Sequence, residues 1–192
     1  MLKKIALALA VVLAVFALYV TTRPSSFRVE RSVVVPADPA FTYAQVADFH
    51  RWDAWSPWAK LDPDMKVEYG GPASGVGATY AWKGNDKAGQ GKMTITSVTP
   101  DREVDVRVDF VKPWEQTNAM RFTFAPEGVG TRVTWTLTGD FDFVGKAFAV
   151  FMSIDRAVGP DFERGLAALQ RVASARPAAP SGEAQPATSP SP

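Results

Sequence analysis

Apolar and polar residues alternate with a period of two through most of residues 27–139. The alternation is clearest over residues 103–110, 118–124 and 132–137, where Val, Met, Phe or Trp alternates with charged residues or Thr. This spacing places apolar side chains on one face of a strand and polar side chains on the other. Turn-forming residues separate the segments at hairpin spacing, so the pattern predicts an antiparallel sheet with one face in water.

The spacing becomes helical over residues 140–173, where apolar residues recur at steps of three and four. The repeat consists of Phe148, Phe151, Val158, Phe162, Leu166 and Leu169. Because no other large apolar surface is available to cover the sheet, we expect one long C-terminal helix packed against its apolar face. Pro160 is expected to kink this helix, since proline lacks an amide hydrogen.

Two short helices are predicted between the first strand, residues 27–35, and the remaining strands. Asp38 can accept hydrogen bonds from the free amides at a helix N-terminus, and Pro39 fits the first turn. Asp48 is expected to cap a second short turn in the same way. With a sheet followed by a helix, the predicted fold class is α+β.

The first 23 residues have the layout of a membrane segment. Two lysines precede an apolar run over residues 5–20, and with the two threonines that follow the run is 18 residues long. A helix of this length extends about 27 Å, at the short end for crossing a bilayer. A cleaved signal peptide is the alternative, with a possible cleavage site at residues 15–17. Bulky Leu18 and Tyr19 directly after that site favour an uncleaved anchor. The four-residue N-terminal tail, with its signal-like layout, favours export of the large domain.

The C-terminal residues 174–192 are rich in Ala, Pro and Ser and contain no bulky apolar residue. Such a segment cannot bury enough surface to become ordered, so we expect it to be disordered. The predicted organisation is therefore a membrane anchor or signal segment over residues 1–23, one folded domain over 24–173 and a tail over 174–192.

Composition argues against several classes of function. The chain has 21 basic and 20 acidic residues spread evenly, so no basic surface indicates a nucleic-acid partner. Cys is absent, which excludes disulfides, thiol catalysis and zinc–thiolate sites. His50 is the only histidine, and no paired carboxylates, nucleophile–base pair or cluster of metal ligands can be assembled. We therefore predict no catalytic residue, no metal site and no cofactor.

Trp52, Trp55 and Trp58 form the densest local pattern, with a spacing of three residues. Large aromatic side chains are core residues first, so they can form a packing cluster at one end of the sheet. They can also form the aromatic rim of a site for an apolar ligand. The two interpretations are compatible if they apply to different members of the trio.

A set of short motifs extends through residues 27–173. They are Trp52-x-x-Trp55-Ser-Pro-Trp58, Asp62-Pro63, Gly70-Gly-Pro72, Gly75-Val-Gly77-Ala-x-Tyr80-x-Trp82, Gly89-x-Gly91-x-Met93, Gly130-Thr-x-Val-x-Trp135 and Gly159-x-Asp161-Phe-Glu-x-Gly-Leu166. In these motifs and in the order of its elements, the chain resembles the bacterial polyketide cyclase/dehydrase and lipid-transport branch of the SRPBCC (START-related) superfamily. The resemblance implies a helix-grip fold, in which a curved antiparallel sheet wraps around the C-terminal helix and leaves an apolar cavity between them.

The expected cavity lies where the strands, the tryptophan segment and the helix converge. Its candidate ligand-binding residues are Trp55, Trp58, Trp82, Met93, Phe110, Asn118, Met120, Phe122, Trp135, Phe151 and Asp155. Helical spacing places Asp155 in the middle of the apolar face, where its carboxylate, together with Asn118, would contact a ligand head group. Alternatively, the kink at Pro160 turns Asp155 outward, or an inward-facing arginine pairs with it.

We therefore expect a monomer, anchored in a bacterial cell membrane by residues 1–23, that binds a small hydrophobic or lipid-like ligand. A cyclase-like or hydrolase-like enzyme that uses the same cavity is the first alternative. A protein-interaction or stress-related module with a filled core is the second, because the fold hosts many functions.

Overall fold

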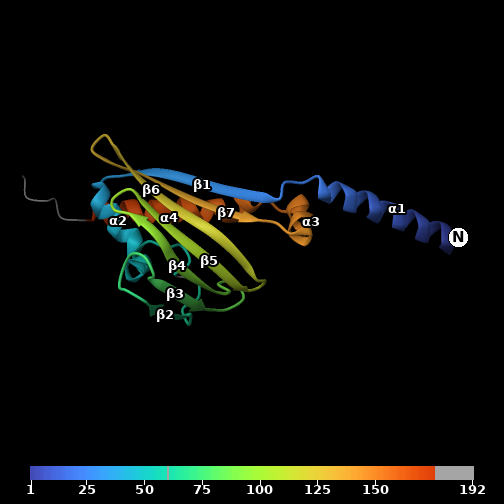
Figure 1. Cartoon of the computed structure of the whole chain (residues 1–192), viewed down its shortest axis with the longest axis horizontal. Coiled ribbons are helices and arrows are strands. Elements are labelled where there is room, and N and C mark those ends of the chain that lie inside the picture. The colour runs from blue at the N-terminus through green and yellow to red at the C-terminus, as the bar shows by residue number, and fades with distance from the viewer. Residues whose placement is uncertain (60, 176–192) are drawn as a thin grey trace, which may run out of the picture.

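In the computed structural model, which describes residues 1–59 and 61–175, a curved sheet holds a long helix against its inner face (Figure 1). The elements in chain order are α1 (Leu2–Thr21), β1 (Ser26–Val35), α2 (Pro39–Ala47), the 3₁₀ helix η1 (Phe49–Ala54), β2 (Lys66–Gly70), β3 (Thr79–Lys83), β4 (Gln90–Thr99), β5 (Glu103–Lys112), β6 (Gln116–Glu127), β7 (Gly130–Asp140), α3 (Phe143–Phe151) and α4 (Ile154–Ser174).

The seven strands form one sheet in the order β1-β7-β6-β5-β4-β3-β2, and every neighbouring pair is antiparallel. Strands β2 to β7 follow one another as a meander, and β1 completes the sheet beside β7. The helix α4 packs under β1, inside the curve of the sheet (Figure 1). This arrangement confirms the predicted α+β helix-grip fold.

The alternating pattern sets which face of each strand is buried. Val104, Val106 and Val108 of β5 are buried, and Phe122 of β6 lies opposite Trp135 of β7 on the same inner face. The α4 side chains Phe162, Leu166 and Leu169 meet this inner face and are almost fully buried. Burial of these side chains between sheet and helix supplies most of the driving force for folding.

The two predicted short helices are present, and both begin at the predicted caps. The Asp38 carboxylate accepts a hydrogen bond from the Phe41 amide at 2.8 Å, and Pro39 occupies the first position of α2. The Asp48 carboxylate accepts a hydrogen bond from the His50 amide at 2.9 Å at the start of η1. These caps satisfy amides that have no partner within the helix.

The long C-terminal helix is confirmed, but it begins at Ile154, and the prediction of one continuous helix over residues 140–173 is wrong. Met152 and Ser153 have extended backbone conformations and separate α3 from α4. Each helix has its own cap, because Asp142 accepts from the Gly145 amide and Ser153 from the Arg156 amide. Because α3 is a separate helix, the packing of α4 against the sheet does not extend to the side chains of α3.

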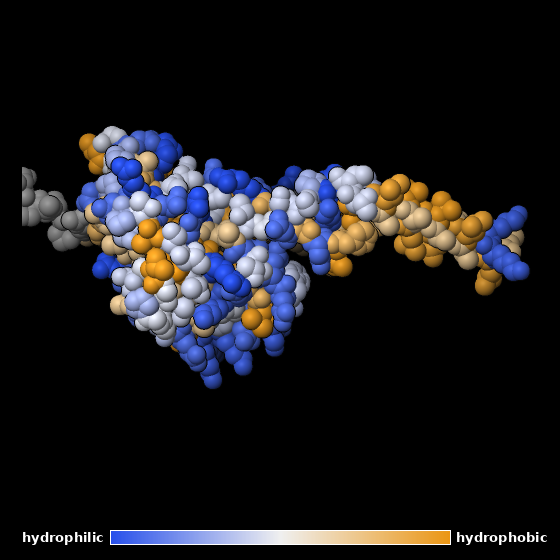
Figure 2. Space-filling model, in the orientation of Figure 1, coloured by the Kyte–Doolittle hydropathy of each residue, from blue (hydrophilic) through white to orange (hydrophobic). Residues whose placement is uncertain are grey.

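The N-terminal helix α1 extends away from the folded domain (Figure 1). It is long and apolar enough to cross a membrane, a property that signal sequences share. Figure 2 shows hydrophobic residues along α1 and on the neighbouring surface of the domain. Most of the predicted disordered tail, residues 176–192, lies outside the described residues.

Candidate functional site

An apolar cavity of about 270 Å³, here called the inner cavity, lies between the sheet, η1 and α4. Exposed polar residues, among them Asp53, Asp86, Lys87 and Lys112, mark where the cavity meets solvent. The larger apolar and aromatic residues of its wall are Trp52, Trp58, Met65, Tyr80, Trp82, Met93, Val108, Phe110, Met120, Leu137, Val158 and Phe162.

Trp82 forms one side of the inner cavity and is fixed by three features. Its indole nitrogen donates a hydrogen bond to the Ala88 carbonyl at 3.0 Å. Its ring lies edge-on to Phe110, with 5.8 Å between ring centroids. The ring also fills the space above Gly91, where a Cβ atom would lie 2.4 Å from it. The rigid indole therefore gives this side of the cavity a defined shape.

Toward α4, the wall residues Trp58 and Phe162 pack on Trp135 behind them, in an aromatic cluster that joins the loop after η1 to β7 and α4. Trp135 stacks on Phe162 with 4.0 Å between centroids, and Trp58 lies edge-on to both rings. Gly165 leaves room for this stack, since a Cβ there would lie 2.8 Å from the Trp135 ring and 3.0 Å from Pro57. The cluster closes the cavity toward α4 with rings that cannot shift independently.

The loops at the cavity opening are tied together by Asp62. Its buried carboxylate accepts hydrogen bonds from the Asn85 amide at 2.6 Å and the Asp64 amide at 3.0 Å. The Asp62-Pro63 motif thus fastens the loop before β2 to the loop after β3.

Tyr80 places a phenol in the cavity wall. Burial raises its pKa to about 12, and the nearby Tyr69 and Asp53 contribute to the increase. The phenol is therefore neutral at physiological pH and can donate or accept a hydrogen bond.

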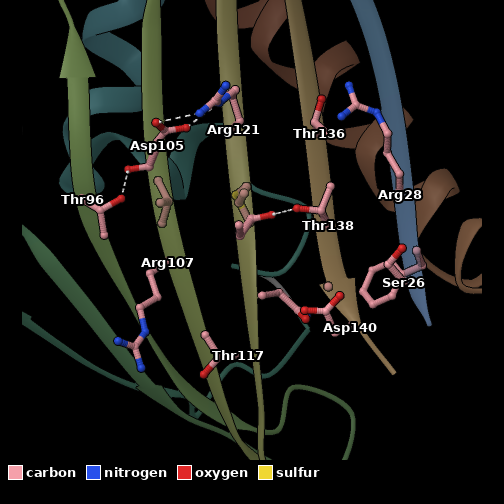
Figure 3. Close-up of a pocket in the computed structure, with 16 residues that line it drawn as sticks. Ser26, Arg28, Thr96, Asp105, Arg107, Thr117, Arg121, Thr136, Thr138 and Asp140 are labelled. Carbon is pink, nitrogen blue, oxygen red and sulfur yellow. Dashed lines mark hydrogen bonds and ion pairs between the residues drawn. The ribbon is translucent and has the colours of Figure 1, made fainter. Parts of the chain in front are cut away.

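A hollow of about 920 Å³ lies on the outer face of the sheet (Figure 3). Threonines and charged residues from five adjacent strands line it, as expected for a solvated face. Its arginines pair with carboxylates on the same face, in the arrangements Arg121–Asp105, Arg107–Asp109 and Arg28–Glu30. Because each of the three arginines that line this hollow is paired with a carboxylate, none of them is free to bind an anionic ligand, and the inner cavity is the better candidate.

Five of the residues proposed from the sequence line the inner cavity. They are Trp58, Trp82, Met93, Phe110 and Met120. Trp55, Phe122 and Trp135 lie in the packed core behind the wall, where each is almost fully buried. The remaining three, Asn118, Phe151 and Asp155, lie outside the lining.

The tryptophan trio divides between packing and the cavity. The Trp52 indole donates to the Val46 carbonyl at 2.9 Å, and the Trp55 indole donates to the Gln45 carbonyl at 3.1 Å. These bonds join η1 to α2, as expected for a packing cluster. Trp58 instead presents its ring to the cavity.

Asp155 is exposed and pairs with Arg31, so its predicted place in the cavity is wrong. Arg31 projects inward from β1 and donates to both Asp155 carboxylate oxygens, at 2.8 and 3.1 Å, and to Glu163 at 2.7 Å. Gly159 lies between the two acids and leaves room for the guanidinium. The hydrogen bond from Arg31 lowers the pKa of Asp155. Helical spacing gave the direction of the side chain, whereas the edge strand β1 determines what lies opposite it.

Phe151 and Asn118 have different reasons for lying outside the lining. Phe151 belongs to the separate helix α3, is 80% exposed and stacks on Phe16 of α1. Asn118 is buried on β6 with its carboxamide oxygen above Gly139, and this oxygen has no hydrogen-bond partner among the described residues. Its register partner Val108 does line the cavity.

The sequence reasoning missed several lining residues that the same pattern could have identified. Tyr80 alternates with Trp82 on β3, and Val108 alternates with Phe110 on β5, so each pair shares one face. Val158 was already assigned to the apolar stripe of the C-terminal helix. Met65 lies in an irregular loop, and no periodic signal could have found it.

His50 lies at the surface, stacked on Tyr69 with its Nδ1 atom 3.0 Å from the Asp48 carboxylate. Within the described ranges, no group of three His, Cys, Asp or Glu side chains could hold a metal ion. The expectation that the chain lacks a catalytic residue and a cofactor stays a prediction.

Residues 26–174 match the model of a family described as polyketide cyclase/dehydrase and lipid transport. A comparison with curated protein sequences gives no significant match. Among solved structures, protein CV1439 from Chromobacterium violaceum is similar at 14% identity and a TM-score of 0.56, covering 80% of this chain and 100% of that one. A protein from Rhizobium leguminosarum has 12% identity and a TM-score of 0.58, covering 79% and 96%.

Protein Ms6760 from Mycobacterium smegmatis has 16% identity and a TM-score of 0.55, covering 77% of this chain and 91% of that one. At these identities the similar structures support the fold, while the family match spans the whole sheet and all of α4. The chain therefore belongs to the polyketide cyclase/dehydrase and lipid-transport family.

Proposed function

We propose that this chain binds a small hydrophobic or lipid-like ligand in the inner cavity while α1 anchors it in a bacterial membrane, with the domain on the exported side. The observation that carries the proposal is the apolar cavity between sheet and helix, with a wall of aromatic and aliphatic side chains. Such a wall favours apolar ligand groups by removing their surface from water. The family description, which includes lipid transport, supports the same class of ligand.

The volume of the inner cavity limits the size of the ligand. Its volume of about 270 Å³ is near the lower end of small-molecule sites, about 300–1,000 Å³, and exceeds the roughly 150 Å³ that holds one benzene. A ring system or part of one acyl chain fits this space, whereas both chains of a phospholipid do not. The exposed polar residues at the opening, including Lys87 and Lys112, can contact a polar head group that stays outside.

Native mass spectrometry of the domain over residues 24–175, purified without detergent, tests the proposal. We expect a copurifying hydrophobic molecule, or binding of an added medium-chain fatty acid that changes the tryptophan emission of the domain, because Trp52, Trp58 and Trp82 line the cavity. A folded domain that carries no such molecule and does not respond to the fatty acid would contradict it and favour a module with a filled core. A ligand that leaves chemically changed would instead favour the enzyme alternative.

A variant whose larger side chain fills the inner cavity tests whether the fatty acid binds there. Met120→Trp adds bulk to the cavity wall and should weaken fatty-acid binding at least about tenfold, while overpacking costs about 1–3 kcal/mol of stability. Val129→Trp places the same side chain in a fully exposed turn and should leave binding unchanged. Equal binding by the two variants would show that the fatty acid binds elsewhere.

A further inference from the structure

The helix α3 exposes an apolar face that the folded domain does not cover. Phe143, Val144, Phe148 and Phe151 are 52%, 57%, 66% and 80% exposed, and no residue of α3 is buried. At 100° per residue these four positions fall on one side of the helix. Monomeric proteins rarely expose large contiguous apolar patches, and such patches mark contact with a membrane, a protein or another ligand.

The contact between α3 and α1 indicates which of these covers the face. The Phe16 ring of α1 stacks on the Phe151 ring of α3, with 6.0 Å between centroids. Val20, one turn further along α1, is fully buried. Apart from this contact, α1 exposes apolar side chains along its length, as a helix surrounded by lipid does (Figure 2). The apolar surface of α1 therefore continues directly onto α3.

We propose that α3 is an interfacial helix, lying with its apolar face in the same bilayer that α1 crosses. Phe16 precedes the end of α1 at Thr21 by five residues, or about 7.5 Å along the helix axis. Interfacial helices bury their apolar face about 5–10 Å into the head-group and acyl boundary. The stack on Phe16 thus places Phe151 at the depth that an interfacial helix reaches.

The residues around α3 fit this position. Asp140 and Asp142 precede α3, and Ser153 and Asp155 follow it, so exposed polar residues lie at both ends of the helix. This pattern lets the helix lie flat at the interface while the chain returns to water at each end. The inference rests on the membrane anchor of the proposed function but not on the ligand.

An interfacial α3 would also orient the inner cavity. Because the sheet is antiparallel, the C-terminal ends of β5 and β7 lie at the same end of the sheet as the N-terminal ends of β1 and β4. The helices α1 and α3 are connected to the sheet at this end. The cavity-lining residues Gly89, Lys112 and Pro113 also lie at this end. Exposed Trp114 lies in the turn between β5 and β6 at the same end of the sheet, and tryptophan is enriched at membrane interfaces. The opening of the cavity therefore lies toward the bilayer, which is a store of hydrophobic ligand.

Single cysteines test the depth of α3, since the natural chain has none. The full-length protein carrying Val144→Cys or Phe148→Cys is labelled with an environment-sensitive fluorophore in nanodiscs of phosphatidylethanolamine and phosphatidylglycerol. Leu9→Cys in the middle of α1 reports insertion of the anchor. Val129→Cys, in the exposed turn between β6 and β7 at the opposite end of the sheet, is the water-exposed control.

We expect labels at residues 144 and 148 to emit at shorter wavelength and to be quenched by doxyl-labelled lipids. Their quenching by iodide should be at least about threefold weaker than at residue 129. Iodide access equal to that of residue 129 would overturn the proposal. So would shielding from both quenchers, because a second copy of the chain would then cover α3. Lipid quenching at residue 9 alone means that the anchor is correct and the α3 inference is wrong.

Discussion

At the scale of single residues, Gly91 and Gly165 provide the space for one aromatic ring in the wall of the inner cavity and one behind it. A Cβ atom at residue 91 would lie 2.4 Å from the Trp82 ring, and one at residue 165 would lie 2.8 Å from the Trp135 ring. Neither glycine has a positive φ. The requirement is therefore for room beside a ring and not for a backbone conformation that only glycine adopts.

We predict that Gly91→Ala destabilises the protein by about 1–3 kcal/mol and weakens fatty-acid binding, because the new methyl group displaces the Trp82 ring. Urea unfolding and a fluorescence titration measure the two effects. Gly128→Ala is the control, since this turn glycine has a φ of +57° and an added Cβ there would meet no atom within 4 Å. It should cost about 1–2 kcal/mol through backbone strain and leave binding intact. Unchanged binding in Gly91→Ala would contradict the role given to Trp82.

The ion pairs of Arg31 show what sequence reasoning about a site could not supply. The helical pattern identified Asp155 as a carboxylate on the apolar side of α4, and pairing with an arginine was one of the alternatives. The choice between cavity and ion pair depends on which strand lies beside the first turn of α4. That strand is β1, more than 100 residues earlier in the chain, where Arg31 points inward.

We predict that Asp155→Asn lowers stability near neutral pH and that the difference from the natural protein disappears in acid. Arg31 lowers the pKa of Asp155 below its ordinary value of 3.8. The contribution of the pair is therefore present above pH 3.8 and is lost as pH falls through the lowered pKa. The effect should be small because both side chains are partly exposed. Urea midpoints that differ by the same amount at neutral and at acid pH would contradict this assignment.

At the scale of elements, period-two alternation was sufficient to predict the strands and their buried faces, while the start of the last helix was not predictable from periodicity. Apolar residues continue at helical spacing from Phe148 through Phe162, although the chain turns at Met152 and Ser153. Neither residue is a glycine or proline, so no breaking signal appears. The break instead depends on Ser153, whose hydroxyl caps a new helix, and on α3 facing away from the sheet.

We predict that Ser153→Ala destabilises α4 by about 0.5–1 kcal/mol, because the Arg156 amide loses its acceptor. The value is at the low end for a cap because the hydrogen bond is long, at 3.4 Å. Ser153→Asp restores an acceptor with a charge that suits a helix N-terminus and should recover the stability. Thermal unfolding followed by circular dichroism distinguishes the variants. Equal melting of all three proteins would show that the hydroxyl does not set the start of α4.

At the scale of the whole molecule, the elements proposed to meet the membrane gather at one end, and the sheet with its cavity extends from them. The family match begins at residue 26, after α1. The sequence predicted an anchor followed by one domain. It could not predict that α3 would lie against the anchor, because residues 16 and 151 are far apart in the sequence and the pairing of β1 with β7 brings them together.

We predict that the full-length protein stays in the membrane fraction after a high-salt wash, because apolar burial is insensitive to charge screening. The domain lacking residues 1–23 should be folded and released from the membrane at high yield. Fractionation followed by immunoblotting measures both. A mature N-terminus at Leu18, found by terminal sequencing, would instead identify a cleaved signal peptide.

The pairing of β1 with β7 also has a consequence for the order of folding. Val35 of β1 pairs with Thr131 of β7, about 100 residues later. At a synthesis rate of about 5–20 residues per second, β7 is therefore made about 5–20 s after β1, and β1 cannot pair before then. The meander from β2 to β7 pairs strands that are close in sequence and can form first. Pulse-labelling hydrogen exchange during refolding should therefore protect β4 and β5 amides before those of β1, and simultaneous protection would contradict this order. On this route the end of the domain that holds α1 and α3 together is the last part to be assembled.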